Sequence, residues 1–195
     1  MASPPAGRYD QAMAGAVNLD YLMLDDSALL RQCEVHTYKS SGPGGQHRNK
    51  VSSAVRLKHP PTGLMAHGDE SRSQHENKAM ALRRLRMNIA LRLRRRLEAQ
   101  SPAELPPVVR ECIFIPRKLG PQAGPRLEIG RKDHRFWAVA AFLLDVLESF
   151  QGRLADSAAS IGISTGNLTS ILESDRHLLG AAQEIRKRYG QKPLK

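Results

Sequence analysis

The sequence has few of the residues that build disulfide-stabilised or metal-stabilised folds. Its 195 residues include two cysteines, Cys33 and Cys112, which are far apart and belong to no CxxC pair. This argues against a disulfide framework and against a zinc site built from thiolates. The histidines show no HExxH spacing, so the sequence indicates no metal and no other cofactor.

Long apolar runs are also missing from the sequence. No uninterrupted apolar segment approaches the roughly 20 residues that span a bilayer, and the N-terminus lacks the basic start and apolar stretch of a signal peptide. Hydrophobic residues nevertheless make up 41% of the chain, which is enough to bury a core. We therefore expect a folded, soluble, cytoplasmic monomer with no membrane partner.

Acidic residues are scarce in one third of the chain. From Arg31 to Arg96 there are 15 Lys and Arg against four acids, whereas the rest of the chain has 15 of each sign, so this third carries the whole net charge of +11. Such a field attracts polyanions, because each phosphate neutralised by Lys or Arg releases a condensed counterion. The pattern predicts a nucleic-acid partner; the alternative is a solvated basic face that maintains solubility.

Residues 25–100 show the pattern of a small α+β domain. Alternating β-branched, aromatic and polar residues predict strands at 34–40, 52–59 and 64–68. A long helix is predicted from about Gln74 onward. Its apolar residues are spaced by three or four and form one stripe: Leu82, Leu85, Ile89, Leu93 and Leu97. We expect this helix to cover one face of the small sheet.

The chain outside this domain differs in composition. Residues 1–24 are rich in Ala, Gly, Pro and polar residues with little periodicity, which predicts a flexible lead-in. Residues 101–131 contain six prolines and are expected to form a Pro-rich linker. From residue 132 to residue 195 the apolar residues return to helical spacing. An all-α domain is therefore predicted to follow the α+β domain.

Residues 157–172 have the spacing of a helix-turn-helix. Gly162 stands at the turn, Ser164 can cap the second helix, and apolar residues lie on both sides. A functional helix-turn-helix would make the chain a DNA-binding regulator. However, the second helix, from Thr165 to Leu172, carries no Arg or Lys. It is poorly equipped to read guanine or to anchor phosphate, so DNA is not the expected partner.

The segment Gly42-Pro43-Gly44-Gly45-Gln46 is unusually rich in glycine. It satisfies GxxG, the backbone clamp of one module that binds single-stranded RNA, and it also fits an ordinary glycine-rich hairpin turn. It is not a Walker loop, because Lys50 is not preceded by Gly, and it lacks GxGxxG. On these residues alone the alternatives stay open.

A longer stretch of sequence favours a specific interpretation. "SSGPGGQHRNKVSSAVRLKHPPTGL" followed by "DESRSQHENKAMALRRL" closely resembles the catalytic domain of class-I peptide-chain release factors, whose Gly-Gly-Gln tripeptide falls on Gly44, Gly45 and Gln46. The resemblance covers roughly residues 30–97, with several motif blocks in the family's order. It implies hydrolysis of the ester that joins a nascent peptide to the terminal ribose of tRNA, in the peptidyl transferase centre of the large ribosomal subunit.

The resemblance implies that the tripeptide is catalytic. Gly44 and Gly45 lack a Cβ, so the backbone can approach the terminal adenosine of tRNA closely. The backbone N–H of Gln46 can donate to the developing oxyanion or the departing 3′ oxygen, while its side-chain amide can position water. No side chain need act as a general base. For His47, the tempting candidate, we favour loop packing or an RNA contact.

A larger set of polar and basic residues is predicted to bind RNA. Those beside the tripeptide are expected to contact phosphates, and domain packing is an equal alternative for the Arg72–His75 stretch. Because arginine stems also cover apolar surface, some arginines of the long helix are expected to serve packing. The set comprises His47, Arg48, Asn49, Lys50, Arg56, Arg72, Gln74, Arg92, Arg94, Arg95 and Arg96. The expected partners are large-subunit rRNA and peptidyl-tRNA.

The sequence departs from the family's pattern in two respects. Pro43 and Arg48 stand where release factors more often carry smaller or apolar residues. Nothing before residue 30 is long enough to be a stop-codon recognition domain, so we expect a codon-independent factor or a ribosome-rescue hydrolase. Rescue hydrolases of this type end in a basic tail, whereas only a modest basic cluster follows a folded domain here, which leaves the trigger open. A non-catalytic ribosome-binding or RNA-binding protein is the alternative.

Overall fold

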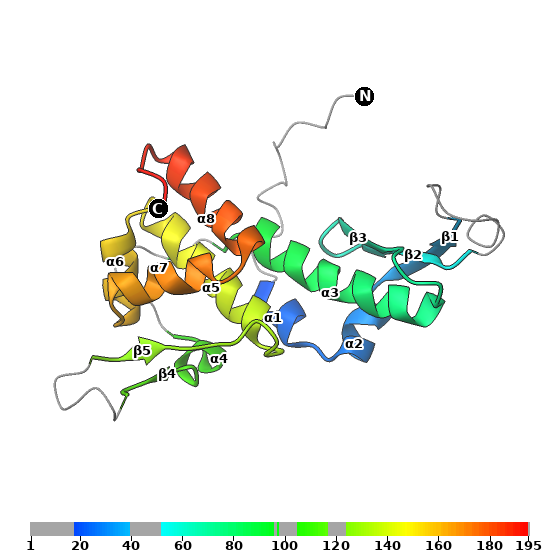
Figure 1. The fold of residues 1–195 in the computed structure, drawn as a ribbon, viewed down its shortest axis with the longest axis horizontal. Helices are drawn as coiled ribbons and strands as arrows, with labels where there is room; N and C mark the ends of the chain where they lie inside the picture. Colours follow the sequence, from blue (N-terminus) through cyan, green and yellow to red (C-terminus); the bar gives the residue numbers. More distant parts are fainter. Residues whose placement is uncertain (1–17, 40–51, 96, 98–104, 117–123, 195) are drawn as a thin grey trace.

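The computed structural model describes residues 18–39, 52–95, 97, 105–116 and 124–194. A small three-stranded sheet lies at one end of the molecule and a group of helices at the other, and the long helix α3 (Gln74–Arg92) runs from one to the other (Figure 1). An α+β part is thus followed by a helical part, as the sequence predicts.

The sheet is antiparallel, in the order β1 (Glu34–Tyr38), β2 (Ala54–His59), β3 (Leu64–Gly68). Its residues alternate between buried and exposed along β2 and β3. The buried set faces α3, so the helix covers one face of the sheet. This alternation is the period-two pattern of a half-buried sheet, and it agrees with the predicted strands.

Helix α3 begins at a serine N-cap and ends earlier than its sequence suggests. The Oγ of Ser73 accepts a hydrogen bond from the backbone N–H of Glu76 at 3.3 Å, which satisfies one free donor of the first turn. The helix ends at Arg92, and Leu93 has extended backbone (φ −85°, ψ 131°). The predicted stripe therefore continues past the helix, and Leu97 lies outside it.

Two short helices precede the sheet: α1 (Asn18–Met23) and α2 (Asp26–Arg31). Leu19 and Leu22 of α1 are buried, and α1 packs against α3 and α5 (Phe136–Ser149). Residues 18–23 thus differ from the loose lead-in predicted for 1–24, because the short apolar pair at 19 and 22 finds a hydrophobic partner in the helical part.

The described residues of the predicted linker also carry structure. They form α4 (Pro107–Arg110) and a two-stranded antiparallel pair, β4 (Ile113–Phe114) and β5 (Arg126–Leu127). Asn167 of α7 (Thr165–Glu173) holds β5 in place, because its side chain accepts from the N–H of Leu127 at 2.8 Å and donates to the carbonyl of the same residue at 3.0 Å. One amide side chain thus satisfies both backbone groups of a buried strand residue.

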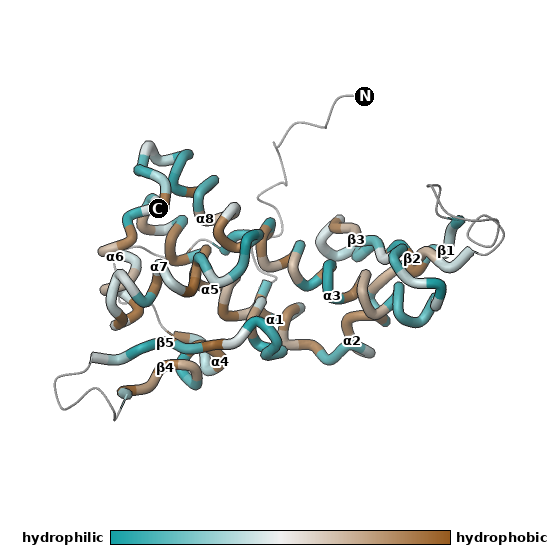
Figure 2. Tube along the Cα trace, in the orientation of Figure 1, coloured by the Kyte–Doolittle hydropathy of each residue, from teal (hydrophilic) through white to brown (hydrophobic). Residues whose placement is uncertain are grey.

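Helix α5 forms the centre of the helical part. Eleven consecutive or near-consecutive residues of this helix are buried, from Phe136 to Leu147, and Figure 2 shows it as a largely hydrophobic segment among the other helices. A helix that is apolar on most sides belongs in a core. The helices α6 (Leu154–Ile161) and α8 (Arg176–Arg188) pack on it, and α7 packs on both of these helices.

The turn between α6 and α7 has the geometry that its residues predict. Gly162 ends α6 with φ +79°, a left-handed conformation that favours glycine, and the Oγ of Ser164 caps α7 by accepting from the N–H of Asn167 at 3.2 Å. The exposed residues of α7 are small, polar or acidic: Thr165, Gly166, Ser170 and Glu173. Helix-turn-helix character in the functional sense stays a prediction.

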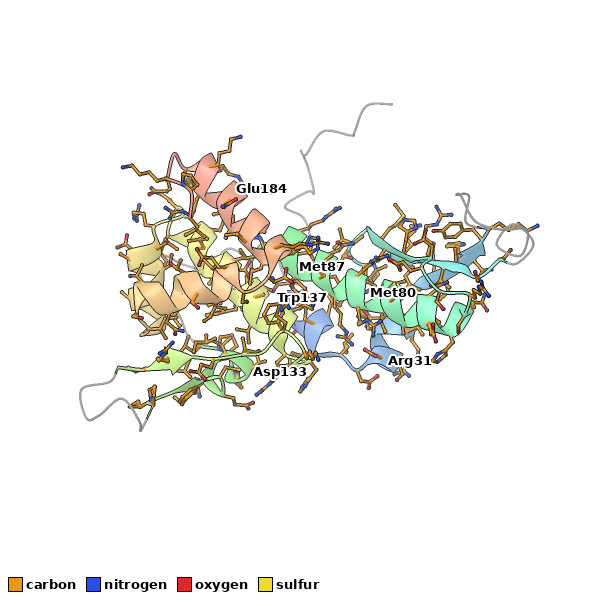
Figure 3. All side chains as sticks on the ribbon, in the orientation of Figure 1. Arg31, Met80, Met87, Asp133, Trp137 and Glu184 are labelled. Atoms are coloured by element: carbon orange, nitrogen blue, oxygen red, sulfur yellow. The ribbon has the colours of Figure 1, made fainter. Side chains whose placement is uncertain are left out.

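The two parts of the molecule share one continuous hydrophobic core, to which α1, α3 and α5 all contribute. Figure 3 labels Met87 on α3 and Trp137 on α5 at this junction. In the part of the chain that the structure describes, no helix combines the length and the apolar character needed to cross a bilayer.

Candidate functional site

The predicted catalytic tripeptide lies in a segment bracketed by two paired strands. Gly44, Gly45 and Gln46 fall within residues 40–51, which lie outside the described residues, as do four predicted RNA contacts: His47, Arg48, Asn49 and Lys50. Tyr38 at the end of β1 pairs with Ala54 at the start of β2. The described residues on the two sides of this segment are therefore paired at one end of the sheet.

Asn77 of α3 ties the base of this segment to the helix. Its side chain is fully buried; the amide nitrogen donates to the carbonyls of Ser53 and Ser71, both at 2.8 Å, and the amide oxygen accepts from the N–H of Ser71 at 2.9 Å. Ser53 directly precedes β2, and Ser71 lies in the connection from β3 to α3. One side chain thus satisfies three backbone groups and fixes where β2 begins.

Gly68 at the end of β3 allows the strand and helix to come this close. A Cβ added there would lie 2.0 Å from the backbone carbonyl oxygen of Asn77 and 3.1 Å from the N–H nitrogen of Ala81. No side chain fits into that space, so the residue must be glycine for α3 to pack at its present distance.

Three other predicted RNA-binding residues lie near this end of the molecule. Arg56 is exposed in the middle of β2, on the sheet face opposite α3, and its guanidinium carbon lies 5.8 Å from the ring centroid of Tyr38. Arg72 and Gln74 are exposed at the start of α3, close to Asn77 in sequence. For all three side chains, a contact with RNA stays a prediction.

The arginines predicted at the C-terminal end of α3 do not join this group. Residues 74 and 92 are separated by about 27 Å along the helix axis, at 1.5 Å per residue. Arg92 and Arg95 are exposed at the far end, beside the helical part, and Arg96 lies outside the described residues. The predicted RNA-binding residues thus form two separate groups at the two ends of α3.

Arg94 has a structural partner that its sequence neighbourhood does not reveal. Its guanidinium lies 3.0 Å from a carboxylate oxygen of Asp145, which is 2% exposed, and also donates to the carbonyl of Ala90 at 2.6 Å. Asp145 further accepts from the N–H of Arg95 and the amide of Asn18, each at 3.0 Å. The Arg94 guanidinium thus has an internal carboxylate partner, in line with the packing role expected for some arginines of this helix, and its contact with RNA stays a prediction.

Burial shapes the electrostatics of this pair. It raises the pKa of Asp145 and lowers the pKa of Arg94, since both charges lose water, whereas the attraction between them opposes both shifts. The three hydrogen bonds to the Asp145 carboxylate favour its charged form. The pair joins α1, the end of α3 and α5, and explains why the chain leaves the helical path after Arg92.

Sequence reasoning missed the roles of Asn77, Gly68 and Asp145. For Asp145 a signal was present, because a carboxylate within the apolar run from Phe136 to Leu147 must have a partner if the helix is buried. For Asn77 the signal is weaker: asparagine is a poor helix residue and often bonds to nearby backbone groups. Nothing local distinguishes Gly68, whose role depends on a helix that begins six residues later.

Comparison with known proteins connects this framework to one family. Residues 29–106 match the family model of the RF-1 domain. Over 73 residues the chain is 49% identical to peptide chain release factor 1 of Leptothrix cholodnii, covering 37% of this chain and 19% of that protein. Over 89 residues it is 42% identical to peptide chain release factor 2 of Acidovorax sp., and 40% identical to that of Neisseria meningitidis, covering 43% of this chain and 24% of each relative.

The match has clear limits and a clear location. The aligned part spans about a fifth to a quarter of the length of these relatives. The region that matches the family model, residues 29–106, contains the sheet, the bracketed segment and α3. The helical part from α5 onward lies outside the matched family region. Residues 29–106 are thus similar to the RF-1 domain, and this part of the chain is similar to peptide chain release factors 1 and 2.

Proposed function

We propose that the chain releases nascent peptides from ribosomes by hydrolysing the peptidyl-tRNA ester, and that it does so whatever codon stands in the A site. The observation that carries the proposal is the Gly44-Gly45-Gln46 tripeptide in an RF-1 domain, in a segment whose two ends meet at the Tyr38–Ala54 pair. Its partners are the large ribosomal subunit and peptidyl-tRNA, and its place is the cytoplasm.

The proposed chemistry needs little beyond the tripeptide. Two successive glycines let the backbone approach the ester, and the N–H of Gln46 donates to the negative charge that develops on oxygen in the transition state. The side-chain amide of Gln46 orients the attacking water. No metal is required for these steps.

The framework supports this role because it makes the base of the segment stiff. Asn77 and Gly68 hold β2, β3 and the start of α3 in close contact, and Asn77 bonds directly to the carbonyl of Ser53 beside the segment's end. A catalytic backbone donor must be held to a fraction of an ångström, so a stiff base favours preorganisation.

We further propose that release does not depend on the codon in the A site. The described residues before β1 form α1 and α2, and α1 packs on α3 and the helical part. Those after α4 form the β4–β5 pair and the helices α5 to α8. We propose that this helical part positions the domain on the ribosome in place of codon reading.

The test is peptide release from ribosomes programmed in three ways: with a truncated mRNA, with a sense codon in the A site, and with a stop codon. The proposal predicts release of labelled peptide in all three cases at similar rates. Release confined to stop codons would contradict codon independence, and binding to all three ribosomes without release would leave a non-catalytic role.

A further inference from the structure

The sheet face that points away from α3 is exposed to solvent and carries tyrosine and histidine rings and positive charge. Its residues alternate with the buried ones, and α3 covers only the other side (Figure 1). We call this surface the outer face, and the strand register places seven residues on it: Glu34, His36, Tyr38, Arg56, Lys58, Met65 and His67. All are exposed except Tyr38, which is half-buried.

Tyr38 and its neighbours form a pre-assembled group on the outer face. The Tyr38 hydroxyl oxygen lies 3.4 Å from Nδ1 of His67, and the two rings meet edge to face with centroids 6.1 Å apart. The Arg56 guanidinium carbon lies 5.8 Å from the Tyr38 ring centroid. The cross-strand neighbour of Tyr38 is Ala54, whose small side chain leaves room for the ring to reach toward β3.

The charge of the outer face is positive. Its acid, Glu34, is paired with Lys58, whose Nζ lies 3.1 Å from a carboxylate oxygen of Glu34. Among the described residues, Arg56 has no carboxylate partner, and Lys39, which follows β1, is exposed without one. Arg56, a cation that no described carboxylate neutralises, therefore lies against the Tyr38 ring on a surface open to solvent.

We propose that the outer face binds an unpaired RNA nucleotide, with the base against the Tyr38–Arg56 group and a phosphate on Arg56. Bases stack on aromatic rings and on guanidinium planes, and such contacts tolerate any sequence because every base has a π-face. An acidic peptide would use the cations but not the rings. The inference rests on the proposed function, which brings the domain to ribosomal RNA, and assigns it a second contact besides the segment 40–51.

The outer face lies next to the tripeptide segment in the sequence, so a contact there would help to position that segment. Tyr38 is the last residue of β1, one residue before Lys39 and two before the segment that contains the tripeptide. A nucleotide held there would fix the sheet end of the molecule against RNA next to the catalytic backbone. Positioning contacts of this kind supply the orientation that a preorganised backbone donor needs.

The test measures binding of the full chain to a fluorescently labelled 12-nucleotide oligo-uridine and, separately, to purified large ribosomal subunits, over a range of salt concentrations. Tyr38→Leu should weaken oligonucleotide binding on the order of tenfold, the usual effect of losing one stacked base. Tyr38→Phe keeps the ring and should bind within about twofold of the parent. Arg56→Gln should weaken binding and lower the salt slope by about one.

Two comparisons separate stacking from a general charge effect and from the Tyr38 hydrogen bond. Lys187→Gln removes one exposed charge from α8, far from the outer face, and should leave the affinity for oligo-uridine within about twofold of the parent. If Tyr38→Phe binds as weakly as Tyr38→Leu, the hydrogen bond to His67 matters rather than the ring, and the stacking proposal is wrong. If Tyr38→Leu and Arg56→Gln both bind like the parent, the outer face does not contact RNA.

The outcome can be told apart from failure of the proposed function. Peptide release by the parent together with unchanged RNA affinity of both variants overturns the outer-face contact and leaves the function standing. Loss of affinity in both variants of a chain that releases no peptide supports the outer-face contact and removes the hydrolase.

Discussion

Arginines lie near both ends of α3 and look alike in the sequence, but their side chains have different surroundings in the structure. Near the sheet, Arg56 and Arg72 are exposed. At the helical end, Arg94 is locked to the buried Asp145, while Arg92 and Arg95 extend to solvent on either side of it in sequence. The difference teaches that charge density predicts a partner class for a region, whereas a single buried carboxylate decides the role of one side chain within it.

The largest expected effect on stability comes from removing the buried carboxylate of Asp145 at the helical end. Asp145→Ala leaves the Arg94 guanidinium largely buried without its partner and removes an acceptor from Asn18 and the Arg95 backbone. We expect a loss of about 3–5 kcal/mol in the free energy of unfolding, measured in urea. Asp156→Ala, which removes an exposed ion pair with Arg153, is the control with a much smaller effect. Equal urea midpoints for the two variants would mean that the buried pair does not hold the two parts together.

The corresponding break at the sheet end is Gly68→Ala. The added Cβ would lie 2.0 Å from the backbone oxygen of Asn77, so β3 and α3 must move apart. We expect a loss of about 1–3 kcal/mol or more in unfolding free energy, together with slower peptide release. Gly166→Ala on α7 adds a Cβ in open space and should be neutral or slightly stabilising. A Gly68→Ala protein as stable as the parent would show that the strand and helix are not in close contact.

The sheet end should also respond to acid through His59. This histidine is fully buried, its ring nitrogens lie 2.8 Å from the Thr62 hydroxyl and 3.2 Å from the Gln32 amide oxygen, and burial lowers its pKa below the ordinary 6.5. The unfolded chain then binds the proton more readily than the folded one, so the unfolding free energy should fall as pH drops below about 6.5. Urea unfolding of the parent and of His59→Asn between pH 7 and pH 5 checks this. Parallel pH profiles for the two proteins would contradict it.

The smallest effect on stability is expected from the exposed arginines of the helical end, which sharpens the contrast with Arg94. Arg92→Gln combined with Arg95→Gln removes two charges whose side chains have no carboxylate partner among the described residues. Unfolding should change by no more than about 0.5 kcal/mol, while the salt slope of ribosome binding should fall by roughly one to two. An unchanged slope would identify these arginines as a solvated face, the alternative that the charge pattern leaves open.

Elements defined by neighbouring residues could be predicted from the sequence. The alternation in 54–59 and 64–68 specifies a half-buried sheet, Ser73 with Glu76 marks the start of α3, and Gly162 with Ser164 marks the turn between α6 and α7. In each case the contacts that determine the element join residues close in sequence, so the local pattern is enough to predict it.

Elements defined by distant partners could not be predicted in the same way. Helix-favouring arginines continue past residue 92, but α3 stops there because Asp145, some 50 residues later, binds the backbone of Arg95 and the side chain of Arg94. Residues 18–23 read as part of a loose lead-in, but α1 is stabilised by packing on α5 and by the bond from Asn18 to the same carboxylate. One buried acid thus accounts for two differences between expectation and structure.

In the candidate site, too, some features depend on neighbouring residues and others on distant ones. Its residue identities follow from the Gly-Gly-Gln motif and its neighbours, whereas the rigidity of its base depends on Asn77 and Gly68, which reach it through tertiary contacts. The outer-face group of Tyr38, Arg56 and His67 likewise depends on strand register rather than on sequence spacing.

The central claim is that the backbone at the tripeptide performs the hydrolysis, and peptide release by Gly45→Ala tests it most directly. The measurement is the single-turnover rate of release from ribosomes carrying labelled peptidyl-tRNA and a truncated mRNA, with Gln46→Ala in parallel and with ribosome affinity and urea unfolding recorded for each protein. The account predicts that Gly45→Ala abolishes release without weakening folding or ribosome binding, because a Cβ blocks the close approach of the backbone, and that Gln46→Ala is milder because the backbone donor survives. Release by Gly45→Ala at the parent rate would contradict the account.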